Sequence, residues 1–177
     1  MTRFQKYKRG QIILVNFNPS TGSELRGKHF AIVLTKKDSP GNGVLTVVPL
    51  SSKNKAYYLD VGNIVSKQIF PLLISQLEEF TRIFQDLDDN GLQYNEEDIN
   101  QVTKNLNELK DIAEMYIKKN KRSYALVQNI TTISKYKILP PTSKYDPLKK
   151  LIADDLILDL IESKLIELFV KDKSNKK

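Results

Sequence analysis

The chain of 177 residues contains no cysteine, only one histidine and no long hydrophobic run. The lack of cysteine excludes a disulfide framework, a zinc site with thiolate ligands and a cysteine nucleophile. No apolar run approaches the ~20 residues that a bilayer-spanning helix requires. Residues 1–10 are basic but lack the apolar stretch of a secretory signal. We therefore expect a cytoplasmic protein that has no membrane partner.

Three well-known catalytic motifs are also missing. The sequence has no G-x-x-x-x-G-K-[ST], no H-E-x-x-H and no G-x-S-x-G, so nucleotide hydrolysis, zinc proteolysis and serine-esterase chemistry have no support. Positive charge is plentiful, since 28 Lys and Arg against 21 Asp and Glu give a net charge of +7. Such a balance is typical of proteins that bind phosphate backbones, although a lysine-rich surface can also serve solubility alone.

Short β-rich segments fill the first third of the chain. The runs 10–17, 29–35 and 44–50 are apolar and rich in β-branched residues, which predicts three strands. A loop containing proline and glycine is predicted over 18–28, and a short strand with a bend over 57–65. Closely spaced short strands favour a small barrel or sandwich.

Helical spacing dominates the middle of the chain. Apolar residues recur at this spacing over 67–85 and again over 96–119, which predicts a helical hairpin. A further strand is predicted over 123–133, and a helix with one apolar face over 147–170. The basic tail, residues 171–177, is predicted to be disordered.

Several short motif pieces follow one another along the first third of the chain. They are Lys8-Arg9-Gly10, Pro19, Gly22-Ser23-Glu24, Gly27 and Pro49-Leu50-Ser51-Ser52. A second stretch, SYALVQNITTISKYKIL, begins at Ser123. Together these pieces resemble the MazF/PemK family of toxin endoribonucleases from type II toxin–antitoxin systems, in which R-G opens the first strand and a P-x-x-G-S-E loop follows it.

The resemblance covers about residues 8–64 and 122–170. It implies an α+β fold, a small SH3-like β-barrel of the MazF/PemK/CcdB type with a C-terminal helix. The helical hairpin, residues 67–119, lies outside the resemblance, and we predict that it is an insertion into a single domain spanning 1–177. The resemblance also implies an endoribonuclease that cleaves single-stranded RNA such as mRNA at a short sequence, with no metal and no cofactor. It further implies a bacterial homodimer that a cognate antitoxin holds inactive.

The resemblance places His29 where the family has its catalytic arginine. Metal-free RNA cleavage needs a group that takes the 2′-hydroxyl proton, a cation that stabilises the phosphorane and an acid for the leaving 5′-oxygen. We predict that Arg26, His29 and Ser51 share these tasks, because they offer a guanidinium, an imidazole and a hydroxyl. The alternatives are a solvated loop arginine, a packed histidine and a serine that only ends its strand.

Further residues are predicted to contact the RNA. In the family's later strand, a glutamine and two arginines align with Asn129, Thr131 and Lys137. Glu24 offers a base or a cap for its loop, and the structural role is the stronger interpretation. The predicted substrate-binding set is Glu24, Lys28, Ser52, Asn129, Thr131 and Lys137.

One competing motif lies between the two helices predicted in the middle of the chain. Asp86, Asp88, Asn90 and Glu97 occupy positions 1, 3, 5 and 12 of an EF-hand calcium loop. However, position 8 holds Gln93 instead of an aliphatic residue, and the sequence has no second loop of this kind. Acidic residues with Asn-Gly are also common in interhelical turns, so this is a weak candidate for a structural metal site.

Two other functions remain open at this point. The change from arginine to histidine leaves room for a non-catalytic module that binds RNA or DNA on the same fold. The fold also leaves room for a CcdB-like toxin that traps a topoisomerase. The basic charge and the Gly-Ser-Glu loop favour the ribonuclease.

Overall fold

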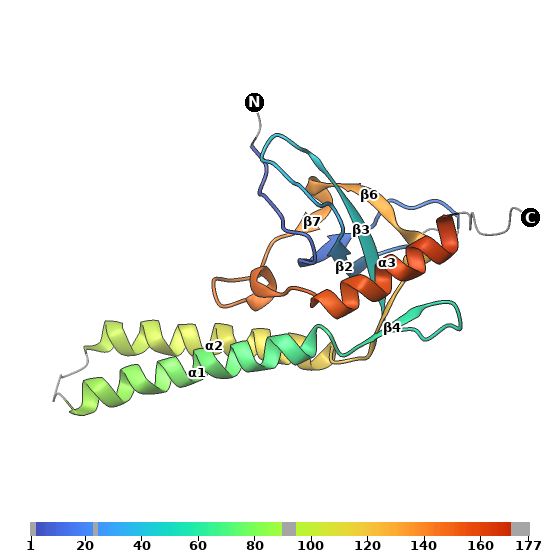
Figure 1. The fold of residues 1–177 in the computed structure, drawn as a ribbon. Coiled ribbons are helices and arrows are strands. Elements are labelled where there is room, and N and C mark those ends of the chain that lie inside the picture. Colours follow the sequence, from blue (N-terminus) through green and yellow to red (C-terminus); the bar gives the residue numbers. More distant parts are fainter. Residues whose placement is uncertain (1–2, 23–24, 90–94, 171–177) are drawn as a thin grey trace, which may run out of the picture.

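The computed structural model describes residues 3–22, 25–89 and 95–170. Within these residues, seven antiparallel strands form one open sheet in the order β4-β5-β3-β2-β1-β7, and β6 pairs with β3. The strands are β1 (Ile12–Asn16), β2 (Lys28–Val33), β3 (Val44–Ser51), β4 (Leu59–Gly62), β5 (Ser123–Ala125), β6 (Thr131–Ser134) and β7 (Ile138–Leu139). Three helices accompany them, α1 (Ser66–Asp89), α2 (Glu96–Lys118) and α3 (Asp155–Phe169) (Figure 1). The α+β class with a small SH3-like sheet is confirmed.

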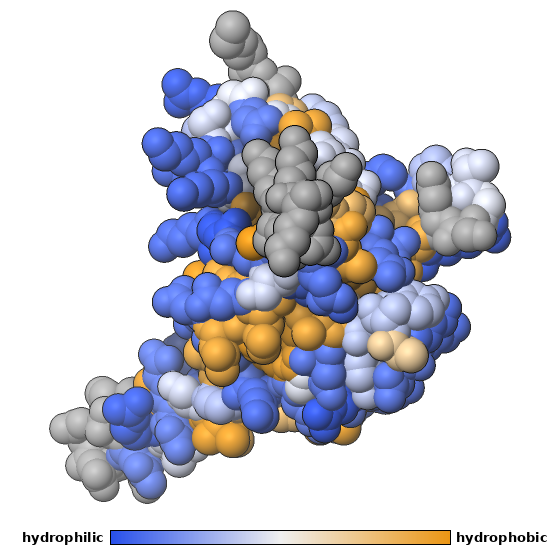
Figure 2. Space-filling model, turned by 45° about the vertical axis from the view of Figure 1, so that its right-hand side comes forward, coloured by the Kyte–Doolittle hydropathy of each residue, from blue (hydrophilic) through white to orange (hydrophobic). Residues whose placement is uncertain are grey.

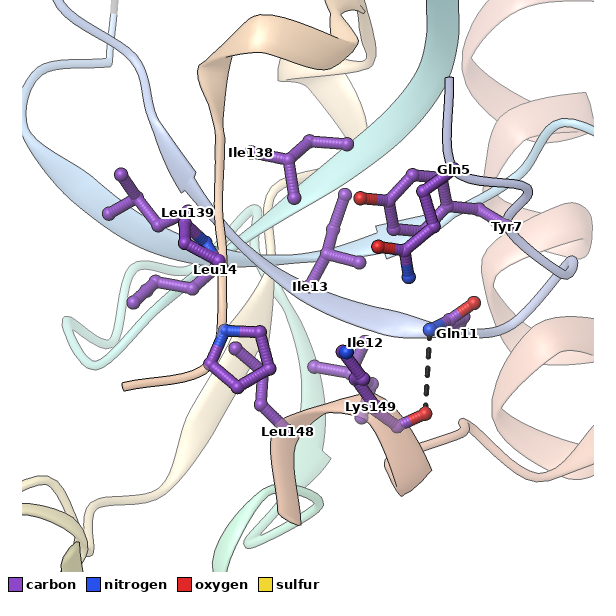
Figure 3. A pocket seen from close by; sticks show the side chains of 12 residues that line it. Gln5, Tyr7, Gln11, Ile12, Ile13, Leu14, Ile138, Leu139, Leu148 and Lys149 are labelled. Atoms are coloured by element: carbon purple, nitrogen blue, oxygen red, sulfur yellow. Dashed lines mark hydrogen bonds between the residues drawn. The ribbon is translucent and has the colours of Figure 1, made fainter. Parts of the chain in front are cut away.

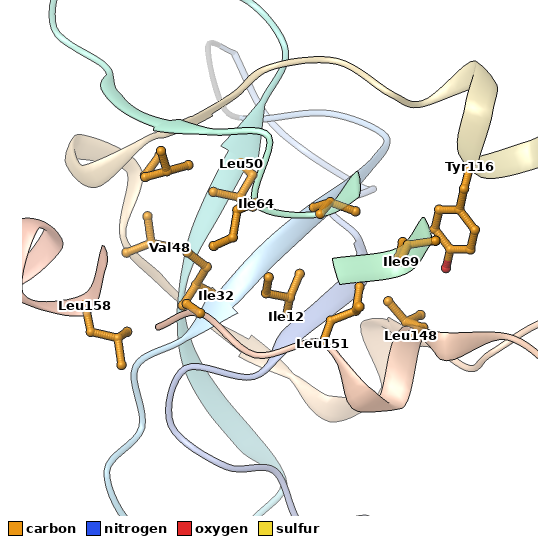
Figure 4. Packing of buried hydrophobic residues seen from close by; sticks show 14 of the residues in the cluster. Ile12, Ile32, Val48, Leu50, Ile64, Ile69, Tyr116, Leu148, Leu151 and Leu158 are labelled. Carbon is orange, nitrogen blue, oxygen red and sulfur yellow. The ribbon is translucent and has the colours of Figure 1, made fainter. Parts of the chain in front are cut away.

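Both faces of the central strands are buried. Successive side chains of a strand point to opposite faces, so Ile12, Ile32 and Val48 join one core cluster (Figure 4), while their neighbours join another. The second cluster consists of Ile13, Val15, Phe17, Ala31, Val33, Leu45, Val47 and Ile133. This double burial explains why β1, β2 and β3 are continuous apolar runs in the sequence instead of alternating ones.

The helical segments form an antiparallel pair that projects away from the strands (Figure 1). Helix α1 spans Ser66–Asp89 and α2 spans Glu96–Lys118, and the side chain of Asn95 caps α2 by accepting a hydrogen bond from Asp98 N at 2.8 Å. Only the end nearest the sheet enters the main core, through Ile69, Leu73, Leu109, Ile112 and Tyr116. The end of α2 is therefore fixed against the sheet. We refer to α1 and α2 together as the hairpin.

The helix predicted over 147–170 is wrong in its first part. Residues Pro147–Lys150 form a 3₁₀ turn, the next residues are extended, and α3 spans only Asp155–Phe169. Backbone hydrogen bonds hold the extended part, since Ile12 N donates to Leu151 O at 3.0 Å and Ala153 N donates to Gly10 O at 2.8 Å. Leu151 is fully buried. These tertiary contacts outweigh the local helical pattern.

The strand predicted over 123–133 is also divided. It consists of β5, a 3₁₀ turn at Val127–Asn129 and β6. Both short strands pair with β3, β5 near its end at Leu50 and Ser51 and β6 near its start. One uninterrupted strand is excluded because the register against β3 changes, with Ala125 opposite Leu50 but Thr131 opposite Val47, and the 3₁₀ turn takes up the extra residues.

The Arg9-Gly10 motif fastens α3 to the sheet. The Arg9 guanidinium forms an ion pair with Glu162 of α3, and it also donates to Leu34 O at 2.8 Å. Gly10 has φ +81, and a Cβ there would lie 3.2 Å from both Ala153 O and Leu158 Cδ1. This part of the family motif therefore has an architectural purpose. Across the described ranges, no helix is both long and apolar enough to cross a membrane.

Candidate functional site

A cationic hollow of about 350 Å³ lies where β2, the end of β3 and the end of α2 meet. We call it the lysine pocket. Its lining consists of Leu14, Lys28, His29, Phe30, Leu50, Ser52, Lys118, Lys119, Lys121 and Ser123. The lining includes four lysines and one histidine, and none of these ten residues is acidic. A hollow with charge of one sign concentrates counter-ions, so this site is suited to an anion.

His29 is held by both of its ring nitrogens. Nδ1 lies 3.1 Å from Leu50 O, and Nε2 lies 2.9 Å from Arg26 O. Both partners are carbonyl oxygens, which can only accept, so the ring satisfies both contacts only when both nitrogens carry protons. The neutral ring makes one of the two hydrogen bonds. To act as a general base, His29 must therefore first release one carbonyl.

Lys119 is the most constrained cation of the lysine pocket. Its ammonium lies 5.7 Å from the centre of the Phe30 ring and 6.0 Å from that of Tyr116, within the range of cation–π attraction. Burial lowers the pKa of Lys119; the charge of Asp146 opposes this shift and that of Lys28 adds to it. An anion bound between the two lysines would stabilise the charged form of both.

Three of the predicted substrate-binding residues lie in a separate hollow of about 340 Å³. Asn129, Thr131 and Lys137 line it together with Pro19 and Leu25 of the loop before β2. The two hollows share no lining residue, and the adjacent residues Pro49 and Leu50 of β3 each line one of them. The structure thus divides the predicted site, with Lys28, His29 and Ser52 in one hollow and the β6-side residues in the other.

The remaining predicted residues lie outside both hollows. The guanidinium of the exposed Arg26 donates to Gly22 O at 3.1 Å, so it supports its own loop. Ser51 Oγ accepts a hydrogen bond from Lys53 N at 3.0 Å, and its neighbour Ser52 lines the lysine pocket instead. Glu24 lies outside the described residues. Of the predicted catalytic trio, the structure therefore places only His29 in a hollow.

The described residues contain no group of three or more His, Cys, Asp or Glu side chains that could hold a metal ion. The weak EF-hand candidate is only partly covered. The backbone of Asp86 and Asp88 belongs to the last turns of α1, and Glu97 lies in the first turn of α2. Asn90 lies outside the described residues.

A third hollow, of about 150 Å³, lies beside β1 (Figure 3). Apolar side chains of β1 and β7 form much of its wall, and Gln11 Nε2 donates to Lys149 O at 3.5 Å across one side. Lys149 is the one charged residue of its lining. This hollow therefore lacks the set of donors and proton-transfer groups that the lysine pocket offers.

The contribution of α2 to the lysine pocket was not predicted from the sequence. Lys118, Lys119 and Lys121 follow the last apolar turn of that helix, and their only sequence signal is a short run of lysines. Nothing in that run indicates that it returns to His29. This contact depends on how the hairpin docks against the sheet.

Comparisons with known proteins identify a similar solved structure and a matching family model. MazF from Deinococcus radiodurans is similar in structure, with a TM-score of 0.48 and 14% sequence identity over 93% of this chain and 97% of that one. No curated protein matches the chain. A family model described as a PemK-like, MazF-like toxin of type II toxin-antitoxin systems matches residues 8–76, which include Lys28, His29 and Ser52. Residues 8–76 of the chain are therefore similar to the PemK-like, MazF-like toxin family.

Proposed function

We propose that the protein is an endoribonuclease toxin that cleaves single-stranded RNA, mRNA included, at a short sequence. The observation that carries the proposal is the lysine pocket, where four lysines, His29 and a serine hydroxyl surround a space large enough for a phosphate group. The family match supports the same activity. In this proposal the toxin acts in the cytoplasm and a cognate antitoxin neutralises it.

The chemistry we propose is transesterification at phosphorus. The 2′-oxygen forms a bond to phosphorus as its proton leaves, the bond from phosphorus to the 5′-oxygen breaks, and the 5′-oxygen takes up a proton. The lysines stabilise the charge that builds on the phosphate oxygens, and the Ser52 hydroxyl adds a neutral donor. His29 takes the 2′-hydroxyl proton at Nε2 once the RNA has displaced that nitrogen from Arg26 O, and then gives this proton to the leaving 5′-oxygen.

We also propose that the active form is a homodimer. Apolar side chains gather in the middle of the face shown in Figure 2. On α3, the large apolar residues Leu156, Leu160, Ile166 and Phe169 are between 43% and 69% exposed. A second copy of the chain would cover such residues and remove them from water. Sedimentation equilibrium of the purified protein checks the mass of the assembly.

The direct test is cleavage of a mixed RNA by the pure protein in excess EDTA, followed by mapping of the fragment ends. We expect cleavage at a recurring short sequence, with EDTA having no effect, because the proposed roles require no ion. Activity that disappears in EDTA and returns with magnesium or manganese would refute the metal-free mechanism. Fragments without a common sequence would refute the specificity.

A second candidate is an RNA-binding module that does not cleave. The geometry of His29 favours it, since both ring nitrogens are held by backbone carbonyls. The same assay separates the two, because the module would retain intact RNA on a filter while producing no fragments.

A further inference from the structure

The lysine pocket carries positive charge that the protein itself does not neutralise. Elsewhere, some cations are paired with carboxylates at short distances, as in Lys135–Asp38 at 2.8 Å and Arg122–Asp60 at 2.7 Å. Among the described residues, Lys28, Lys119 and Lys121 have no carboxylate within 4.0 Å, and Lys118 has only the exposed Glu114 at 3.9 Å. These four lysines line one hollow whose lining contains no acidic residue, which points to an external anion.

These charges come from two parts of the chain that the fold brings together. Lys28 lies on β2 beside His29, whereas Lys118, Lys119 and Lys121 lie at the end of α2, outside the residues that match the toxin family. Tyr116 anchors that end, because it is 3% exposed and its hydroxyl donates to Asp146 Oδ1 at 2.8 Å. The position of the α2 lysines is thus set by a buried contact.

We infer that the end of α2 is part of the RNA site, and that Lys118, Lys119 and Lys121 bind phosphates of the strand that crosses His29. This inference rests on the proposed function, and it assigns a substrate-binding role to the hairpin. Lys119, held between the Phe30 and Tyr116 rings, contacts the phosphate nearest His29. Lys118 and Lys121, on either side of it in sequence, contact the neighbouring phosphates of a flexible single strand.

Lysines at the end of a helix also have a simpler explanation, since they complement the helix dipole. Under that explanation they affect folding stability and leave RNA binding unchanged. The two explanations differ in salt dependence. Each lysine that neutralises a phosphate of a single strand makes the slope of log association constant against log salt concentration more negative by about 0.7. At 0.1 M salt, one such contact corresponds to about a fivefold change in affinity.

The experiment uses the full chain and a fluorescent RNA in which every 2′-hydroxyl is methylated, so that it binds without being cleaved. Fluorescence anisotropy gives Kd from 50 to 300 mM salt for the wild type, Lys119→Gln, and Lys118→Gln with Lys121→Gln. The matched control combines Lys104→Gln and Lys110→Gln, which remove two lysines from the same helix away from the pocket. Lys119→Arg keeps the charge at the central position.

We expect the magnitude of this slope to fall by about 0.7 for Lys119→Gln and by about 1.4 for the Lys118 and Lys121 pair, with affinity about fivefold and 25-fold weaker at 0.1 M salt. The control and Lys119→Arg should keep the wild-type slope. Equal slopes for all variants would overturn the inference even if the wild type cleaves RNA. If the wild type binds with these slopes but cleaves no RNA, the inference stands and the proposed catalysis falls. A wild type that does not bind this RNA overturns the inference outright.

Discussion

Removal of the Tyr116 hydroxyl tests how the hairpin is anchored. Tyr116 and Asp146 are 3% and 7% exposed, and the hydroxyl donates to the carboxylate at 2.8 Å. Tyr116→Phe keeps the ring and therefore leaves no cavity, so the cost is that of one hydrogen bond to a charged acceptor, about 1.5–3 kcal/mol. For a domain of this size, that lowers Tm by about 3–12 °C.

The assay is thermal unfolding followed by circular dichroism, with urea unfolding as a second measure. In urea, the midpoint should fall while the m-value stays constant, because the surface exposed on unfolding is unchanged. Tyr136→Phe is the matched control, since that residue is 75% exposed and its change should cost little. A Tyr116→Phe protein that melts within a degree of the wild type would show that the buried hydrogen bond does not hold the hairpin.

Four further changes address the site, the buried ion pair and the family motif. His29→Gln should lower RNA cleavage by about 10²-fold in a single-turnover assay of protein that circular dichroism shows to be folded, and normal cleavage would remove the catalytic role from His29. Lys135→Met leaves Asp38 buried without its partner, which should cost about 3–5 kcal/mol in urea unfolding, and a loss below 1 kcal/mol would contradict this. Burial alone would raise the pKa of Asp38, but hydrogen bonds from Lys135 and backbone amides lower this pKa below the ordinary value of 3.8. The ionised Asp38 therefore stabilises the fold above that pH, and this stabilisation is lost as the pH falls further. Asp38→Asn should accordingly flatten the loss of Tm between pH 5 and pH 2. Gly10→Ala places a side chain at φ +81 against Ala153 O and should cost about 1–3 kcal/mol in the same urea assay, and an unchanged midpoint would contradict the architectural role of this glycine.

The strands of the first third could be predicted because their apolar runs are bounded by turns. The runs 10–17, 29–35 and 44–50 contain or nearly contain β1, β2 and β3. The helical spacing over 67–85 and 96–119 likewise coincides with α1 and α2. In both cases the pattern is local, so neighbouring residues carry enough information.

The errors occur where a distant partner decides the conformation. The segment around Leu151 has a helical pattern but is extended, because its backbone bonds to β1, about 140 residues earlier. The residues of the candidate site likewise differ in whether a local motif or a distant contact determines their role. His29 and Lys28 could be proposed from the motif, whereas the role of Lys119 depends on the docking of the hairpin, which no local pattern reveals.

The lysine pocket also has a consequence for synthesis of the chain. Its two halves, Lys28–Phe30 and Lys118–Ser123, are separated by about 90 residues. At ~5–20 residues per second, a ribosome needs about 5–20 s to pass from the first half to the second. Throughout that interval the nascent chain contains the residues of β1, β2 and β3 but lacks the end of α2 that completes the pocket. Contacts between residues so far apart in the sequence form only after the intervening chain has closed into a loop. A product that stops before the end of α2 therefore has no lysine pocket, whatever the state of its first three strands.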